Sequence, residues 1–365
     1  MKTLEDSTLQ VILDSDEILW ESIREKIKIW YDFHKRNLPW RNTQDPYRIW
    51  ISEVILQQTR VAQGLDYYHR FVDRFPDVSA LAAAPEEEVL RLWQGLGYYS
   101  RARNLHQAAQ MVMNEFDGRF PGDYQKILLL KGIGTYTAAA IASFAFNEAY
   151  PVLDGNVMRV LSRLFAVDLP IDSNEGKKAL TAIAEKLLDR SAPAQHNQAM
   201  MEIGALQCVP THPDCPSCPL SACCSAYALH KVEDYPVKSH VTKVRDRYIV
   251  YYYIRCKETI WLHHREEKDI WHGLYDFPFV ELDHEPDDAE IVRALKTILA
   301  DDVDVVLHDH PVRKVHKLSH QTLHVAFLSV EIENPVPALD AYKRVSVTDW
   351  DRFPKPRLIQ NYLQR

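Results

Sequence analysis

The sequence lacks the features that mark membrane and secreted proteins. In its 365 residues no stretch approaches the roughly twenty apolar residues that a helix needs to cross a bilayer. The N-terminal segment MKTLEDSTLQ has no uninterrupted apolar core, so it does not read as a signal peptide. The cysteines form no spaced pairs of the kind that build a disulfide framework. We therefore expect a cytoplasmic protein (nucleoid-associated in a bacterium) with no membrane partner, and we expect it to be a monomer.

An excess of basic residues is also absent. The sequence has 43 Lys and Arg against 51 Asp and Glu, which gives a formal net charge of −8. Such a chain does not bind DNA by its overall charge, although the composition leaves room for a local basic surface. Basic residues do recur at 34–36, at Arg101 and Arg103, and between Lys238 and Arg247. Because charge runs are usually solvated faces, they are weak evidence alone.

The most informative feature that is present is a cysteine-rich loop near the middle of the chain. Four of its cysteines are separated by six, two and five residues, namely Cys208, Cys215, Cys218 and Cys224. Thiolates bunched this tightly suit one metal centre better than a disulfide framework, and a structural zinc site is the general interpretation. Cys223 competes with Cys224 as a ligand, whereas Cys256 lies far away in a strand-like segment.

Apolar periodicity divides the chain into two parts. In the first part apolar residues recur three or four positions apart, as in 18–33, which predicts a succession of helices. The segment 229–246 is polar and interrupted by proline, so we interpret it as a linker. Beyond it, β-branched and aromatic stretches such as RYIVYYYIRC predict strands, with one helix at 289–299. The predicted fold class is multidomain, with an all-α region at 1–228 and an α+β domain at 247–365.

Two glycines separate helix-forming segments in LLLKGIGTYTAAAIA, at 128–142. Gly132 and Gly134 let the backbone approach a partner closely, and the free N–H groups at the start of the next helix can hold a phosphate. A lone G-x-G turn is more often a tight corner, but the flanking sequence resembles the helix-hairpin-helix motif, spanning about 124–146. That resemblance implies a grip on the DNA backbone that does not depend on base sequence.

Two carboxylates are candidates for cleavage of a glycosidic bond. Asp154 precedes a predicted helix, so its simplest interpretation is an N-cap. Glu53 lies in WISEVILQQT, a helix that is apolar almost all round and therefore buried. Burial raises the pKa of a carboxyl, and a Glu that is protonated near neutral pH is a general acid. A protonated and an ionised carboxyl together could protonate a leaving group and stabilise a cationic sugar.

Long motifs then connect the chain to a known family. The strings LPWR, DPYRIWISEVILQQTRV, GLGYYSRARNL, LKGIGTYTAAAI and VLDGNVMRVLSR resemble adenine DNA glycosylase of the MutY family. The cysteine spacing resembles the [4Fe–4S] loop of the endonuclease III superfamily. The resemblance implies a [4Fe–4S] cluster on the four cysteines, at 208–224. It also implies excision of adenine that is mispaired with 8-oxoguanine or with guanine in double-stranded DNA.

The resemblance also implies roles for particular residues. Glu53 would protonate N7 of the extruded adenine, Asp154 would stabilise the sugar cation, and Tyr136 and Asn156 would orient these groups. Gln58 and Tyr98 would wedge into the base stack when the adenine is flipped out. The implied pocket lining is Trp40, Arg41 and Leu56, with Gln198 and Glu202 nearby. For Tyr98 and Trp40 the alternative is an ordinary core aromatic.

Position 136 separates two subfamilies. Endonuclease III carries a lysine there, which forms a Schiff base and nicks the strand. A tyrosine cannot form that adduct, so the resemblance implies a monofunctional glycosylase, or at most a feeble lyase, that leaves an abasic site.

The C-terminal part resembles a Nudix domain, most clearly in WHGLYDFPF at 271–279. It has no R-E-x-x-E-E run to hold Mg²⁺, so we do not expect pyrophosphate hydrolysis. The family reads 8-oxoguanine through an F-S-H triplet, and here the triplet is Leu318-Ser319-His320. The polar pair is retained, so Ser319 and His320 are the implied lesion contacts. The cluster loop departs from its relatives as well, because it holds no Lys or Arg between Cys208 and Cys224.

Two alternatives remain at this point. One is a glycosylase for oxidised pyrimidines, against which Tyr136 and the Nudix-like domain argue. The other is an iron–sulfur sensor that binds DNA without catalysis, against which a buried Glu53 argues, because a pure binder has no need of one.

Overall fold

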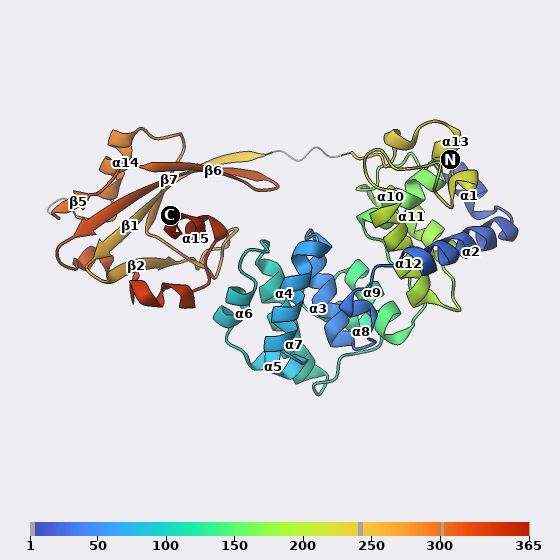
Figure 1. Cartoon of the computed structure of the whole chain (residues 1–365), viewed down its shortest axis with the longest axis horizontal. Coiled ribbons are helices and arrows are strands. Elements are labelled where there is room, and N and C mark those ends of the chain that lie inside the picture. Colours follow the sequence, from blue (N-terminus) through green and yellow to red (C-terminus); the bar gives the residue numbers. More distant parts are fainter. Residues whose placement is uncertain (1–3, 240–243, 301–302, 365) are drawn as a thin grey trace. The chain divides into compact units, whose positions relative to one another are not determined.

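The structure is a computed structural model of the chain, and it describes residues 4–239, 244–300 and 303–364. The chain divides into two compact units that do not follow the order of the sequence, and Figure 1 labels their helices and strands. The helical unit contains the residues up to Ala82 and those from Gln107 onward to the linker. The C-terminal unit contains the strands and also the segment Ala83–His106. The predicted linker, 229–246, includes residues 240–243, which lie outside the described residues.

Every regular element in the described part of the helical unit is a helix, as the periodicity predicts. Its members are α1 (Leu4–Leu13), α2 (Glu17–His34), η1 (Pro39–Arg41), α3 (Pro46–Leu56), α4 (Val61–Arg74), α5 (Val78–Ala83), the second half of α7 (Ser100–Glu115), α8 (Tyr124–Leu129), α9 (Thr135–Phe146), α10 (Gly155–Leu164), α11 (Asn174–Leu187), α12 (Pro193–Leu206), η2 (Ser221–Cys223), α13 (Ser225–Ala228) and η3 (Val232–Asp234).

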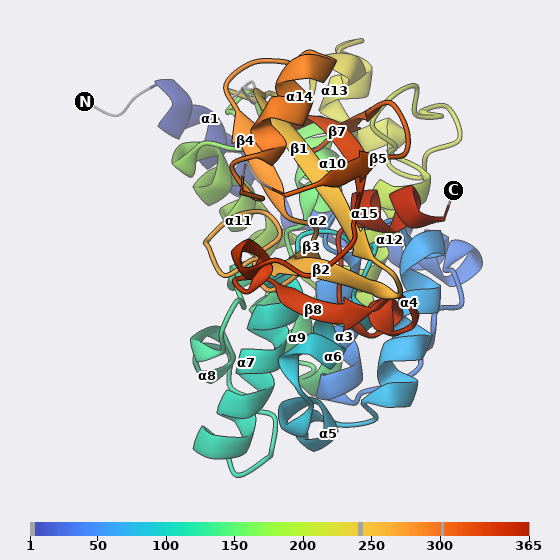
Figure 2. The ribbon, with the colours of Figure 1, turned by 90° about the vertical axis from the view of Figure 1, so that its left-hand side faces the viewer.

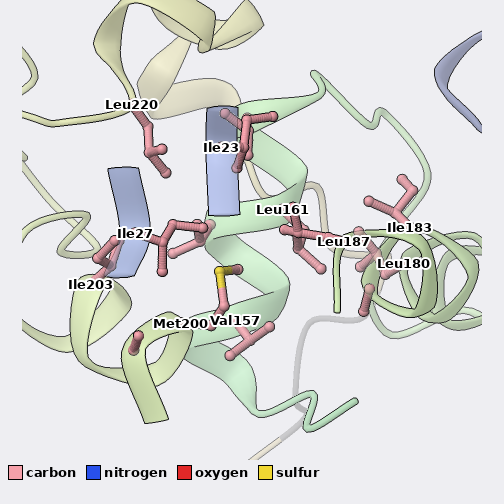
Figure 3. Close-up of a cluster of buried hydrophobic side chains, with 14 of the residues drawn as sticks. Ile23, Ile27, Val157, Leu161, Leu180, Ile183, Leu187, Met200, Ile203 and Leu220 are labelled. Carbon is pink, nitrogen blue, oxygen red and sulfur yellow. The ribbon is translucent and has the colours of Figure 1, made fainter. Parts of the chain in front are cut away.

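A hydrophobic core joins α2, α10, α11 and α12. Figure 3 shows side chains from these helices meeting, with Ile27 of α2 and Leu161 of α10 among them. Helix α2 is preceded by the N-cap Asp16, whose carboxylate accepts a hydrogen bond from the Ile18 N–H at 3.1 Å and so caps the first turn. Its apolar residues follow the helical period and line one face. This core fixes the helices that carry the functional groups described below.

Helices α3, α10 and α12 bring those groups to one place. Pro46 begins α3 after the capping Asp45, and every residue from Ile49 to Ile55 is buried, as the all-round apolar sequence predicts. Helices α10 and α12 cross closely at Gly204. A Cβ there would lie 2.6 Å from the Cβ of Asn156, so only glycine allows this approach.

The C-terminal unit combines helices with a mixed sheet. Its members are α6 (Glu86–Leu92), the start of α7, β1 (Arg245–Cys256), β2 (Thr259–His264), β3 (Tyr275–Asp276), β4 (Phe279–Leu282), α14 (Asp288–Leu295), β5 (Val305–Leu307), β6 (Val312–Lys317), β7 (Gln321–Ile332), η4 (Pro337–Leu339), β8 (Lys343–Ser346), η5 (Val347–Arg352) and α15 (Arg357–Leu363).

Two long strands form the centre of the sheet. The strand order is β3-β2-β1-β7-β5, and β4 pairs with β1, β6 with β7 and β8 with β2. Strands β1 and β7 run parallel in register from Arg245↔Gln321 to Arg255↔Glu331, and they lie side by side in both views (Figures 1 and 2). The register places even-numbered β1 residues such as Tyr252 against α14, and odd-numbered ones such as Tyr253 against α15.

The predicted fold class is confirmed, because a helical region precedes a C-terminal domain with a mixed sheet. Within the described part of the chain, no helix is both long enough and apolar enough to cross a bilayer.

Candidate active site

One cavity in the helical unit gathers most of the predicted site residues. It has a volume of about 750 Å³ and lies among α3, α9, α10 and α12. All four predicted catalytic residues and six of the predicted base contacts line it: Trp40, Arg41, Glu53, Leu56, Gln58, Tyr136, Asp154, Asn156, Gln198 and Glu202. These residues come from segments more than 150 positions apart, so the fold alone brings them together.

Glu53 is the buried carboxyl that the sequence predicts. Its side chain lies in the middle of α3 and is only 6 % exposed. The Tyr136 hydroxyl donates a hydrogen bond to Glu53 Oε2 at 2.5 Å. Burial raises the pKa of Glu53 to about 7, the Tyr136 bond opposes this, and the negative charge of Asp154 adds to it. The group is therefore close to half protonated at neutral pH, as a general acid should be.

Asp154 is both an N-cap and a wall of the cavity. Its Oδ1 accepts a hydrogen bond from the Val157 N–H at 2.7 Å, which caps α10, as its simplest interpretation predicts. Its Oδ2 accepts one from Asn156 Nδ2, also at 2.7 Å. Burial raises the pKa of Asp154, but these bonds favour the ionised form and limit the rise. The two carboxyls thus differ in environment, since Glu53 is held by one hydroxyl and Asp154 by a helix N-terminus.

A charged fork forms another wall of the cavity. The fully buried Glu202 accepts hydrogen bonds from Arg36 and Arg41, with Nη2 to Oε2 distances of 2.6 and 2.7 Å. Burial alone would raise the pKa of Glu202, but the bonds from both guanidinium groups outweigh it and lower the pKa to about 2. Glu202 is therefore ionised and fully occupied, so it acts in the cavity mainly by fixing Arg36 and Arg41.

The remaining lining residues are held in defined positions. Gln198 accepts a hydrogen bond from the Tyr31 hydroxyl at 2.8 Å, which leaves its amide group as a donor. The buried Trp40 packs edge-on against Tyr68 with a centroid distance of 5.1 Å, so it is at once a core aromatic and part of the lining. Gln58 follows α3 with a φ of 56°, an unusual value for a residue other than glycine. Such a backbone is typical of functional sites.

The glycine hairpin lies between α8 and α9, outside the cavity. Gly132 has a φ of 75°, which requires glycine, whereas Gly134 is extended and precedes α9 as its N-cap. A Cβ at Gly134 would meet no protein atom within 4 Å. Packing within the protein therefore does not demand glycine at 134, and the exposed backbone is open to a partner.

Four cysteines of the loop are electrostatic neighbours. Burial raises the pKa of the Cys218 thiol to about 11, and the charges of Cys208, Cys224 and Cys215 add to it. Cys223 differs, because its thiol donates to the Leu220 carbonyl at 3.3 Å, and the charge of Lys26 lowers its pKa against the rise caused by burial. Within residues 4–239, 244–300 and 303–364 no group of three or more His, Cys, Asp or Glu side chains is arranged to hold a metal ion.

Two arginines of α10 anchor the cysteine loop. Arg163 donates to the Cys208 sulfur at 3.4 Å and to the carbonyls of Val209 and Pro210 at 2.7 and 2.8 Å. Arg159 donates to the Cys208 carbonyl at 2.9 Å and to Asn156 Oδ1 at 3.0 Å. The loop is thus tied through Arg159 to the amide that orients Asp154.

Comparisons with known proteins agree with this geometry. Residues 51–190 match the family described as HhH-GPD superfamily base excision DNA repair protein, and residues 250–365 match the NUDIX domain. The adenine DNA glycosylase of Buchnera aphidicola from Acyrthosiphon pisum is 34% identical over 297 residues, which cover 81% of this chain and 83% of that protein. The chain belongs to the adenine DNA glycosylase family.

Other relatives support the assignment over different lengths. The adenine DNA glycosylase of Arabidopsis thaliana is 36% identical over 341 residues, covering 78% of this chain but 52% of the plant protein. The chain thus spans about half the length of that relative. A solved thermostable thymine-DNA glycosylase superposes with a TM-score of 0.54 at 30% identity, covering 57% of this chain and 97% of that one. Endonuclease III trapped on DNA superposes with a TM-score of 0.51 at 23% identity, covering 59% and 99%, which supports the fold alone.

Tyr98, one of the two predicted wedge residues, and the predicted lesion contacts lie in the C-terminal unit of this glycosylase, whereas Gln58 lines the cavity of the helical unit. Tyr98 precedes α7, is 40% exposed and has a φ of 45°. Its hydroxyl is hydrogen-bonded to the Ser319 hydroxyl, in the turn between β6 and β7. His320 occupies the same turn, and its carbonyl accepts from the Arg245 N–H at 3.0 Å. Tyr98 and Ser319, more than 200 residues apart, therefore meet in one place.

Some groups of the site were missed by the sequence reasoning. The sequence places Arg36 only in a basic run, whereas in the structure its guanidinium donates a hydrogen bond to the buried Glu202. Arg159 gave no sequence signal beyond its place in VLDGNVMRV. A buried Glu on α12 was a usable signal, because such a group needs a cationic partner.

Proposed function

We propose that this adenine DNA glycosylase removes adenine that is paired with 8-oxoguanine, or with guanine, in double-stranded DNA and leaves an abasic site. The observation that carries the proposal is a buried Glu53 with a pKa of about 7 in the same cavity as Asp154. The cavity is large enough for a purine, and its wall offers the amide of Gln198 and the indole of Trp40. The lesion contacts fall on Ser319 and His320.

The proposed reaction divides the work between the two carboxyls. Glu53 gives its proton to N7 of the flipped adenine, so the electron pair of the breaking C1′–N9 bond moves onto a neutralised leaving group. Asp154, whose carboxylate accepts hydrogen bonds from Val157 and Asn156, stabilises the positive charge that develops on the sugar. A water molecule then adds to C1′ of the sugar cation and transfers one proton to a carboxylate of the site. The products are free adenine and an abasic site.

Tyr136 supports a monofunctional enzyme. Burial raises the pKa of its hydroxyl well above the usual range, and the charge of Glu53 adds to this, so the phenol stays protonated. A phenol forms no imine with the sugar aldehyde, and the strand is therefore left intact.

We further propose that Cys208, Cys215, Cys218 and Cys224 hold a [4Fe–4S] cluster. These four thiols act on one another electrostatically and are the donor set that such a cluster takes, whereas the Cys223 thiol donates to the Leu220 carbonyl. When bound, the cluster would cross-link the segment after α12 to the segment before α13, and Arg163 would donate toward its Cys208 ligand.

A single-turnover assay with four duplexes tests the function. The duplexes differ only at one pair: 8-oxoguanine:adenine, guanine:adenine, thymine:adenine and a thymine-glycol control. We expect adenine release from the first two and strand breakage only after alkali. Release of thymine glycol with retention of adenine would favour the glycosylase for oxidised pyrimidines. Tight binding without any release would favour the sensor.

The rate of adenine release is expected to fall on both sides of neutral pH. Above a pH of about 7, Glu53 loses the proton that it must donate. At acidic pH, Asp154, whose pKa is raised by burial, gains a proton and no longer stabilises the cation. Single-turnover rates measured against pH should give a bell-shaped curve with a basic limb near pH 7. Tyr136→Phe should move that limb to higher pH, because the Tyr136 bond lowers the pKa of Glu53; a flat profile would contradict the assignment.

A further inference from the structure

The turn that presents Tyr98 has an unusual backbone. Gly95 and Gly97 have φ values of 98° and 73°, and Tyr98 itself has a φ of 45°. A bulky residue rarely adopts this left-handed conformation unless its surroundings impose it. Tyr98 is 40% exposed, whereas its neighbour Tyr99 is 4% exposed. Something in the fold must therefore hold Tyr98 outward.

Arg101, in the first turn of α7, supplies the hold. Its Nη2 donates to the carbonyls of Leu96 and Gly97 at 3.3 and 3.2 Å, which are the two carbonyls preceding Tyr98. The indole N–H of Trp93 donates to the same Gly97 carbonyl at 3.1 Å. The Arg101 side chain thus closes the turn by reaching back over it.

The same guanidinium packs against two aromatic rings. It lies 5.1 Å from the ring centroid of Trp93 and 5.8 Å from that of Tyr98. Such cation–π contacts orient a ring as well as attract it. Burial lowers the pKa of Arg101 to about 10, so the group stays charged at neutral pH. The backbone and the ring of Tyr98 are therefore both held by one side chain.

The outer end of Tyr98 is held as well, because its hydroxyl bonds the Ser319 hydroxyl. Ser319 lies in the two-residue turn that Leu318 and Gln321 close, with the Leu318 N–H donating to the Gln321 carbonyl at 2.8 Å. That turn is itself supported by the buried Arg247, which donates to Gln321 Oε1 at 3.1 Å. Arg101 thus holds the backbone that precedes Tyr98, and Ser319 holds its hydroxyl, with both contacts inside one unit.

We infer that Arg101 is a positioning residue, which holds Tyr98 in the geometry that enters the duplex beside the lesion contact Ser319. The inference rests on the proposed function and on the wedge role that the family resemblance implies for Tyr98. A planar guanidinium suits this task, because it packs on the rings of Trp93 and Tyr98 while its Nη2 bonds both carbonyls, whereas the compact ammonium of lysine has no planar face to set against a ring. Arg101→Lys therefore removes the geometry while it keeps the charge that a DNA phosphate would attract.

The test uses the full chain in a Glu53→Gln background, so that the duplex stays intact during binding. Arg101→Lys, Tyr98→Ala and the double variant are compared with Arg91→Lys, an exposed arginine of α6 that pairs only loosely with Glu88. Dissociation constants are measured for 8-oxoguanine:adenine and thymine:adenine duplexes. The fluorescence of a 2-aminopurine placed beside the lesion reports unstacking of the bases. The melting temperatures of the variants are compared as well, because a change in fluorescence between variants of equal melting temperature does not come from a loss of fold stability.

Arg101→Lys is expected to weaken binding of the lesion duplex about tenfold and to suppress the 2-aminopurine signal, since wedging pays for base extrusion. The double variant should bind no worse than Tyr98→Ala, and Arg91→Lys should bind like the background protein. Unchanged lesion binding in Arg101→Lys, or losses that simply add in the double variant, would overturn the inference. If the background protein itself fails to prefer the 8-oxoguanine duplex, the proposed function fails instead.

Discussion

Glu53→Gln is expected to lower the single-turnover rate of adenine release by about a thousandfold, with DNA affinity retained. General acid catalysis contributes roughly 10²–10⁴ in rate, and Glu53 is the buried carboxyl of the cavity that carries a proton near neutral pH. Glutamine keeps the volume and can still accept the Tyr136 hydrogen bond, so the cavity should keep its shape. It has no proton of suitable acidity to give to the leaving base.

A stability measurement separates lost chemistry from lost folding. The folded pKa of Glu53, about 7, lies above its ordinary value of 4.5. Between these two values the folded protein binds more protons than the unfolded chain, so the contribution of Glu53 to the free energy of unfolding falls as pH rises. Glu53→Gln should therefore be at least as stable as wild type at neutral pH. A variant that is inactive because it is unfolded would behave in the opposite way.

The matched control is Glu25→Gln, on the exposed face of α2. Its rate and its free energy of unfolding should equal those of the wild type within error, because an exposed carboxylate contributes little to stability. Retention of adenine release within tenfold in Glu53→Gln would remove Glu53 from the role of general acid.

Local patterns in the sequence predict the helices and the buried acid well. The apolar period at 18–33 corresponds to α2, and the one at 180–188 to α11. The all-round apolar character of WISEVIL places Glu53 in the core, and it is 6 % exposed. These features follow from side chains within one or two turns of each other, which is the range over which sequence periodicity carries information.

The pairing of distant groups is not predictable in the same way. The fork of Arg36 and Arg41 on Glu202 joins residues more than 160 positions apart, and the basic run at 34–36 gave no sign of it. Strands β1 and β7 pair in parallel across the intervening hairpins, a register that neither strand specifies alone. The left-handed backbone at Gln58 and Tyr98 is likewise imposed by the surrounding fold. Long-range packing decides these features.

The segment Ala83–His106 shows the same limit at the level of domains. Sequence order predicts one helical region up to 228, yet this segment belongs to the compact C-terminal unit. Within that unit, the Tyr275 hydroxyl donates to Glu87 at 2.6 Å and Arg103 donates to the His272 carbonyl at 2.5 Å. Helical periodicity reports that α6 is amphipathic, but it carries no information on the element that covers its apolar face.

Cys218→Ser is expected to abolish iron binding and to lower the free energy of unfolding by more than about 4 kcal/mol, a loss typical of removing a metal site or a buried network. The charges of Cys224 and Cys215 raise the pKa of the Cys218 thiol, and Cys218 packs against the core of α2, α10 and α12. The cost should thus spread from the loop to α10, whose Arg159 and Arg163 donate to Cys208.

Cys223→Ser is the matched control, because it removes a thiol of similar burial from the same loop. Its sulfur donates to the Leu220 carbonyl, and a serine hydroxyl can make the same bond, so iron content and stability should stay near the wild-type values. Elemental analysis and urea unfolding of both variants decide between three outcomes. Iron lost only in Cys218→Ser supports the four assigned ligands. Iron lost in Cys223→Ser would exchange Cys223 for Cys224 in the ligand set, and one zinc per chain in the wild type would replace the cluster by a structural zinc site.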